Sequence, residues 1–162
     1  MRIGVVSDTH NHLANVARIV DLLNAAGVER VVHTGDITQP GTLERLARLD
    51  APLWGVFGNN DLGEREGLAA ASARLGLVLC DPPLEVVWAD RRVVVVHDPR
   101  ELERLADPPA VALHGHTHRR RLERTAGGTL VFNPGECAGH LAGHNAVGVV
   151  DLAALEVEIL SF

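Results

Sequence analysis

The sequence is poor in cysteine and has no long apolar run. Its two cysteines, Cys80 and Cys137, lie far apart in the chain. A disulfide framework or a zinc-thiolate site needs more cysteines, so we expect two unpaired thiols that are buried or half-buried. No apolar stretch approaches the ~20 residues that a membrane-spanning helix requires. The sequence therefore excludes a small disulfide scaffold and predicts no membrane segment.

An excess of positive charge is also missing. The formal net charge is -6, from 21 acidic and 15 basic residues. A chain of this sign has little non-specific affinity for nucleic acid or for an anionic membrane, so neither is an expected partner. A phosphate-bearing substrate stays open, because bound metal ions can reverse the sign of the potential locally.

The length and composition of the chain are typical of a globular protein. The chain has 162 residues, of which 46% are hydrophobic and 22% charged, so it can bury a core and disorder is not expected. No linker or change of composition divides it, and we expect one domain over residues 1–162. The opening residues MRIGVVSDTH carry an apolar run too short for a signal peptide. They predict a buried strand in a cytoplasmic protein.

The first half of the chain alternates between two kinds of segment. Apolar, β-branched segments at residues 2–7, 31–33 and 53–57 predict strands. Each is followed by a polar loop and then by a segment that predicts a helix, at residues 13–26, 42–48 and 66–75. Three such units in succession predict a parallel sheet covered by helices, with a ligand site at the carboxyl ends of the strands.

The second half has shorter strands and fewer helices. The sequence here predicts a short helix at 100–105 and a single strand at 111–113. The turn chemistry predicts three hairpins, which pair residues 84–88 with 92–96, 119–124 with 129–132, and 146–151 with 155–160. This pattern favours a second, more antiparallel sheet stacked on the first.

Polar residues gather where the predicted strands end. Carboxylate oxygens suit hard divalent ions, and imidazole nitrogens suit borderline ones. In an extended loop, residues two apart can turn to one side, and glycines at positions 35, 58 and 115 allow tight turns. The candidate metal ligands are Asp8, His10, Asp36, Asn59, His97, His116 and His118.

The size of this ligand set predicts two divalent ions, because it exceeds what one ion takes from a protein. Two ions about 3.5–4 Å apart can polarise phosphate oxygens and turn a bridging water into a hydroxide nucleophile near neutral pH. Two ions, two aspartates and one hydroxide leave the site at about +1 by formal charge, which attracts an anionic phosphate.

The order of these blocks resembles a known family. The motifs D-x-H, G-D, G-N-x-D, a single His and G-H-T-H, from Asp8 to His118, are similar to those of the calcineurin-like metallophosphoesterases. The short length and the loop that begins at Asn133 resemble its small, cap-less phosphodiesterase branch, found in bacteria and archaea. One H-x-H pair alone would be weak, but five blocks in the right order and spacing are a strong indication.

The resemblance implies a fold and a division of the ligands. The fold is α/β, a four-layer αββα sandwich of two stacked mixed β-sheets flanked by helices. The implied ligands of one metal are Asp8, His10 and His118, those of the other are Asn59, His97 and His116, and Asp36 bridges both. Manganese is the most frequent metal of the family, although iron, zinc, nickel and cobalt also occur in it.

Two positions depart from the family pattern. In the phosphoprotein phosphatases of the family a histidine follows the motif asparagine, whereas this chain has Asn60. An amide cannot protonate a leaving group but can hydrogen-bond a phosphate oxygen, so Asn60 is predicted to bind substrate and support catalysis. Asp98 stands where glycine is usual. We favour an N-cap role for Asp98 over a hydrogen bond to a ligand imidazole.

Other polar residues are interpreted as structural. Asp61 is expected to order its loop or the following helix, and His33 to be packed and hydrogen-bonded within its strand. His12 carries no predicted function. His140 and His144 follow the Asn133 loop, and their roles stay open.

The sequence thus predicts a hydrolase acting on a small phosphodiester, with nucleotide-like molecules as candidate substrates. A phosphomonoesterase using the same site is the alternative among enzymes. A non-catalytic scaffold of the retromer-subunit type is the alternative outside them; loss of ligands would favour it, and the sequence keeps all seven. The natural substrate and the metals are not predicted, and a homo-oligomer stays open.

Overall fold

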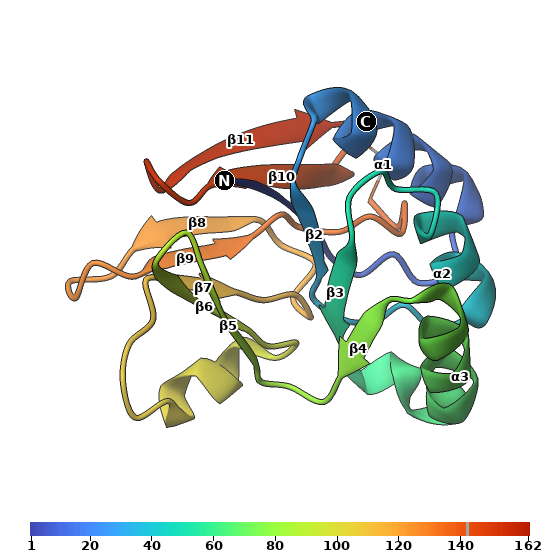
Figure 1. Ribbon diagram of the computed structural model, residues 1–162, viewed down its shortest axis with the longest axis horizontal. Coiled ribbons are helices and arrows are strands. Elements are labelled where there is room, and N and C mark those ends of the chain that lie inside the picture. Colours follow the sequence, from blue (N-terminus) through green and yellow to red (C-terminus); the bar gives the residue numbers. More distant parts are fainter. Residues whose placement is uncertain (142) are drawn as a thin grey trace.

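The computed structural model describes residues 1–141 and 143–162 and shows two stacked β-sheets with helices outside them (Figure 1). The elements in chain order are β1 (Arg2–Val6), α1 (Leu13–Ala26), β2 (Arg30–His33), α2 (Pro40–Leu46), β3 (Leu53–Val56), η1 (Asn59–Glu64), α3 (Arg65–Leu75), β4 (Val78–Cys80), β5 (Leu84–Trp88), β6 (Arg91–Val95), η2 (Pro99–Arg104), β7 (Val111–Leu113), β8 (Arg121–Arg124), β9 (Leu130–Asn133), β10 (Ala146–Asp151) and β11 (Glu156–Ser161). None of the helices in this part of the chain has the length and hydropathy that crossing a bilayer requires.

The first sheet has the strand order β11-β10-β1-β2-β3-β4. Its strands β1 to β4 run parallel, as the repeated strand–loop–helix pattern predicts. Helix α1 buries Val16, Ile19, Val20 and Leu23, whose three- and four-residue spacing forms one apolar face. It ends at Gly27, which takes a left-handed φ of 61°. The helices α1, α2 and α3 lie on one side of this sheet (Figure 1).

The second sheet has the strand order β5-β6-β7-β9-β8. Its three middle strands are parallel and its two edge strands antiparallel. The outer layer here is thin: Leu102 of η2 and the nearby Leu105 lie around one pocket with Ala112 and Val131 of the sheet. The predicted α/β fold of two mixed sheets flanked by helices is confirmed.

An apolar layer between the sheets holds them together. Along β1, Ile3 and Val5 face the second sheet, whereas Val6 faces the helices. From the second sheet, Leu113 and Phe132 are completely buried in the same layer. Full burial of each such side chain contributes roughly 1.5–3 kcal/mol. This packing fixes the strand ends of both sheets relative to one another.

The prediction that the closing hairpin belongs to the second sheet is wrong. Strand β10 pairs antiparallel with β1, and β11 pairs with β10, so this hairpin extends the first sheet. Five of the six residues of β10 are buried. Val147 and Val149 pack in the helix layer, and Val150 packs between the sheets. Only a strand that is covered on both faces can bury five consecutive residues. The strand β4 and the 3-10 helix η1 are additional to the predicted elements.

Candidate metal centre

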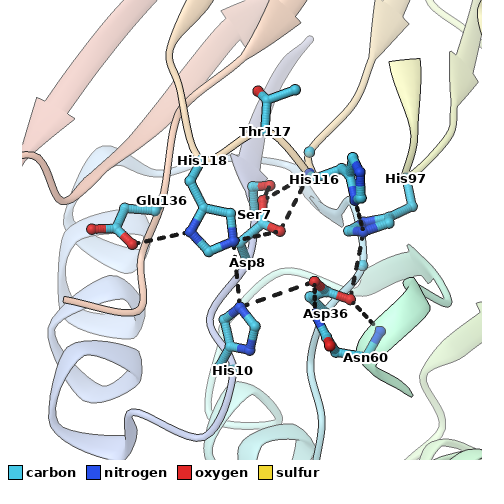
Figure 2. Close-up of polar contacts among 12 residues, drawn as sticks. Ser7, Asp8, His10, Asp36, Asn60, His97, His116, Thr117, His118 and Glu136 are labelled. Carbon is cyan, nitrogen blue, oxygen red and sulfur yellow. Dashed lines mark hydrogen bonds and ion pairs between the residues drawn. The ribbon is translucent and has the colours of Figure 1, made fainter. Parts of the chain in front are cut away.

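Strands of both sheets end at one edge of the sandwich and bring the seven predicted ligands together. Figure 2 labels all of them except Asn59. The loop after β1 carries Asp8 and His10, the loop after β2 carries Asp36, η1 begins with Asn59, His97 follows β6, and the loop after β7 carries His116 and His118. The predicted ligands therefore come from five separate segments of the chain, which is why only the folded chain assembles them.

The first donor group consists of Asp8, His10, Asp36 and His118, each of which offers an atom within 4.8 Å of the others. Nε2 of His118 lies 3.5 Å from Nε2 of His10 and 3.5 Å from Oδ1 of Asp8. Oδ2 of Asp36 lies 4.0 Å from Nε2 of His10. Atoms that each bind one ion at about 2.1 Å lie about 3–3.5 Å apart, so these spacings fit a single divalent ion.

The second donor group consists of Asn59, His97 and His116, again with Asp36. Oδ1 of Asn59 lies 2.9 Å from Nε2 of His97 and 2.9 Å from Nδ1 of His116. Nδ1 of His97 must carry its hydrogen, because it donates to the carbonyl oxygen of Thr34 at 2.9 Å. Nε2 is therefore the ring nitrogen of His97 that remains for a metal ion, and it faces the oxygens of Asn59 and Asp36. A ring nitrogen and two oxygens that face one another in this way suit a divalent cation.

Asp36 lies between the two groups. Its Oδ2 faces His10, and its Oδ1 lies 3.5 Å from Nε2 of His97. Asn60 fixes this carboxylate, because its backbone N–H donates to Oδ1 at 2.9 Å and its side-chain amide donates to Oδ2 at 2.7 Å. The structure thus shows Asn60 orienting the carboxylate that lies between the two groups (Figure 2). Its predicted contact with substrate stays a prediction.

Burial sets the charge states of the donors. It lowers the pKa of His10, which favours the neutral ring that metal binding needs. It raises the pKa of Asp8, whose carboxylate is completely buried and accepts hydrogen bonds from Ser7 and from the backbone N–H of His116. A cation beside Asp8 would offset the cost of burying its charge. The donor set therefore fits divalent metal ions in type, spacing and charge.

The ligands converge through an unusual backbone rather than an extended one. Asp8, His10, Asp36, His116 and His118 all have positive φ, between 45° and 68°. This left-handed region costs a non-glycine residue roughly 1–2 kcal/mol. The prediction that each D-x-H or H-x-H pair turns to one side is confirmed, but its expected extended geometry is wrong. Strain of this kind concentrates at functional sites.

Three glycines lie against the centre, as predicted, but for two different reasons. Gly35 has a φ of 103° and faces Nδ1 of His97, which a Cβ would approach to 2.6 Å. Gly115 has no positive φ in the structure, and it is needed for space alone: a Cβ there would lie 2.8 Å from Oδ2 of Asp8 and 2.8 Å from Oγ1 of Thr34. At Gly58, a Cβ would overlap Asp36.

Gly115→Ala should weaken metal binding. The added methyl group must displace the fully buried Asp8 and Thr34, and overpacking of this kind costs about 1–3 kcal/mol of stability. Calorimetric titration with manganese and thermal unfolding of the metal-free protein measure the two effects. Gly63→Ala is the matched control, because a Cβ at that position meets nothing within 4 Å. Equal metal affinity in both variants would contradict the assignment.

Glu136 is a site residue that the sequence analysis did not single out. Its side chain is completely buried, and Oε2 lies 3.2 Å from Nδ1 of His118 (Figure 2). Oε1 accepts the backbone N–H of Leu141 at 2.5 Å. A carboxylate at Nδ1 keeps the hydrogen there and turns the Nε2 lone pair toward the first donor group. The only indication in the sequence is an acidic residue in the loop that begins at Asn133.

Asp61 has the structural role that was predicted. It accepts hydrogen bonds from the backbone N–H groups of Asp36, Thr38 and Gly58, at 3.1, 2.6 and 2.7 Å. Burial raises its pKa, while these backbone donors favour its charged form. Asp61 thereby joins the loop that carries Asp36 to the loop that carries Asn59.

Asp98 and His12 are helix caps. Asp98 accepts the backbone N–H of Arg100 at 3.0 Å at the start of η2, which confirms the favoured interpretation. Hydrogen bonds from Arg100 lower the pKa of Asp98 to about 2. His12 accepts the backbone N–H of Asn15 at 3.2 Å at the start of α1.

His140 and His144 lie near the first donor group. The ring centroid of His140 is 5.3 Å from that of His10 and 5.6 Å from that of His118. His144 lines a cleft of about 350 Å³ together with His118 and Arg119. Both histidines thus border the centre.

His33 is packed and hydrogen-bonded, as predicted. Its Nδ1 accepts the backbone N–H of Gly35 at 3.1 Å, so Nε2 carries the hydrogen and donates to Oγ1 of Thr9 at 3.0 Å. Complete burial lowers its pKa from 6.5 to about 3. His33 is therefore a neutral brace between the loops after β1 and β2.

The pKa of His33 predicts a loss of stability in acid. Its lowered pKa means that the unfolded state binds the extra proton first, so stability falls as the pH drops from 6.5 toward 3. At pH 5 this amounts to about 2 kcal/mol. Urea unfolding of the metal-free protein at pH 7 and pH 5 should show a smaller loss for His33→Gln than for wild type. His12→Gln, at the exposed cap, should keep the wild-type loss, and equal losses in all three proteins would refute the prediction.

The two-sheet sandwich and the cluster of acidic and imidazole ligands at its edge define a class, the metal-dependent phosphoesterases. A family model described as the calcineurin-like phosphoesterase superfamily domain matches residues 1–155, and the chain belongs to this superfamily.

Two similar proteins agree with this assignment, and a third shares the fold. A phosphodiesterase from Methanocaldococcus jannaschii is 33% identical over 156 residues, which cover 93% of each chain. A solved structure of an archaeal phosphodiesterase has a TM-score of 0.90 and 31% identity and covers all of both chains. A Vps29 variant from Entamoeba histolytica has a TM-score of 0.70 at 18% identity, over 100% of this chain and 99% of the other. At that identity the likeness shows the fold alone.

Proposed function

We propose that this protein is a metal-dependent phosphodiesterase that hydrolyses small phosphodiesters at a site for two divalent ions, with manganese as the favoured metal. The observation that carries the proposal is the pair of donor groups that share the Asp36 carboxylate. Each group has the ligand types and spacings of one ion. Two adjacent ions are an arrangement suited to phosphoryl transfer.

The ions, when bound, would polarise the phosphate oxygens and lower the pKa of a coordinated water. The chain's own residues position them. Asn60 holds both carboxylate oxygens of Asp36, and Asp61 holds the loop that carries it. On the other side, Glu136 holds the ring of His118. Because these braces are already formed, little reorganisation is needed when substrate binds.

Asn60 also favours diesters over monoesters. No acidic group replaces the family histidine at this position, so the chain offers no proton there to a poor leaving group. The identity of 33% to a phosphodiesterase supports the same preference. A phosphomonoesterase with the same ligands is the alternative.

A comparison of two chromogenic substrates tests the proposal. Wild type should hydrolyse bis(p-nitrophenyl) phosphate only when manganese is present, and with a higher kcat/KM than p-nitrophenyl phosphate. The same ratio should be measured with iron, zinc, nickel and cobalt. A higher kcat/KM for the monoester would favour the phosphomonoesterase, and no metal-dependent turnover of either substrate would overturn the enzyme.

The scaffold alternative has less support. All seven predicted ligands converge in the structure, whereas a scaffold has no need to preserve them. Metal analysis of the purified protein distinguishes the enzyme from the scaffold, because only the enzyme needs bound ions. Removal of the ions by a chelator should lower the activity and the thermal stability of the enzyme together.

A further inference from the structure

A cleft of about 330 Å³ lies beside the second donor group. One part of its wall consists of the predicted ligands Asn59, His97 and His116. The rest comes from the loop after β3, from η1 and the start of α3, from the loop after β4, and from Asp98 and η2. A diester whose phosphorus lies next to Asp36 can therefore place one of its two ester groups in this cleft.

The cleft contains a fixed planar cation. The Cζ atom of Arg65 lies 4.3 Å from the ring centroid of Phe57, and its Nη2 lies 2.5 Å from Oδ2 of Asp81. Phe57 is only 7% exposed, whereas the side chain of Arg65 is 39% exposed. The guanidinium is thus held by an aromatic ring and a carboxylate and still presents surface to a ligand. Leu62, which is 70% exposed, adds an apolar surface to the same cleft.

The charges in the cleft argue against a second phosphate as its ligand. Arg65 is paired with Asp81, and Arg100 is paired with Asp98. Glu101 adds a further carboxylate, which accepts the backbone N–H of Asp98. Neither arginine that lines the cleft is therefore left without a carboxylate partner. The carboxylate oxygens suit amino groups, and the guanidinium and Leu62 suit a flat apolar face.

We propose that this cleft binds the base of a nucleoside that forms one ester group of the substrate, with the base stacked on Arg65. Stacking of a base on an arginine or aromatic group tolerates different bases, because every base has a π face. The proposal deepens the proposed function, on which it rests, by naming the substrate class as nucleotide-type phosphodiesters. Arg65 is then a specificity-determining residue.

Equilibrium binding tests this without any turnover. Adenosine 5′-phosphate and ribose 5-phosphate share the phosphate and the sugar and differ in the base. Titration calorimetry in the presence of manganese should show that wild type binds the adenosine compound about tenfold more tightly, as expected for one stacked base. In Arg65→Ala and in Arg65→Lys, which keeps the charge but not the plane, the two affinities should become equal while that for ribose 5-phosphate stays unchanged.

Arg74→Ala is the matched control, because Arg74 lies on the same helix and pairs with Glu44 outside the cleft. It should keep the wild-type ratio. Equal affinities in wild type, an unchanged ratio in both Arg65 variants, or no binding of either compound would overturn the proposal. If wild type binds the adenosine compound more tightly but does not hydrolyse diesters, the proposed function alone is refuted. If it hydrolyses diesters but binds both compounds equally, the cleft assignment alone is refuted.

Discussion

Asp36→Asn should lower metal-dependent diester hydrolysis by on the order of 10³-fold, because the only carboxylate shared by both donor groups is lost along with several kcal/mol of transition-state stabilisation. Stability should change in the opposite sense. In the metal-free protein burial raises the pKa of Asp8, and repulsion from the charge of Asp36 adds to this rise. The metal-free variant should therefore unfold at a temperature equal to or above that of wild type, while the stabilisation that manganese gives wild type disappears.

Asp151→Asn is the control for this prediction. Asp151 also ends a strand and accepts a backbone N–H, from Ala153 at 2.8 Å, but it lies outside the centre. The variant should keep wild-type hydrolysis within about twofold, since surface substitutions of this kind have small effects. If Asp36→Asn retained full activity, or melted far below wild type without metal, Asp36 would be a structural residue and not a shared ligand.

Glu136→Ala should weaken binding of metal at the first donor group by about 10- to 100-fold, the range for residues that orient a ligand. The change leaves Nδ1 of His118 and the backbone N–H of Leu141 without their acceptor. Glu136→Gln keeps an acceptor oxygen and should have a smaller effect. Competition with a chromogenic chelator measures the affinity, and the KM for a diester should change less than the metal concentration needed for half-maximal activity.

Glu123→Gln serves as the control for Glu136. Glu123 lies on the exposed strand β8 and pairs with Arg121, so its loss should leave metal affinity unchanged. A Glu136→Ala protein with wild-type affinity and altered KM would instead make Glu136 a residue that acts on the substrate.

The convergence of the predicted ligands could be anticipated from the sequence, because their positions follow from local pattern. Asp8, Asp36 and Asn59 each come directly after an apolar strand, and parallel strands bring such residues to one edge. The partner of the closing hairpin is a long-range property and was therefore missed. The run at Ala146–Asp151, apolar at nearly every position, is the sign of a strand covered on both faces.

The role of Glu136 and the left-handed backbone of the predicted ligands could not be predicted from the sequence, for a different reason. Glu136 acts through the ring of His118, 18 residues earlier, and a buried carboxylate in a loop has no distinct local signature. The positive φ of Asp8 and His116 is imposed by packing against neighbouring loops, because local propensity alone disfavours it. Tertiary contacts, such as the hydrogen bond from the backbone N–H of His116 to Asp8, decide both features.

The most direct test of the central claim is a titration of metal-free protein with manganese in which bound ions and hydrolysis of bis(p-nitrophenyl) phosphate are measured together. The shared Asp36 carboxylate predicts two ions per chain, with activity rising as the second ion binds. Full activity in the metal-free protein, or saturation at a single ion with full activity, would contradict a site built from two donor groups around Asp36.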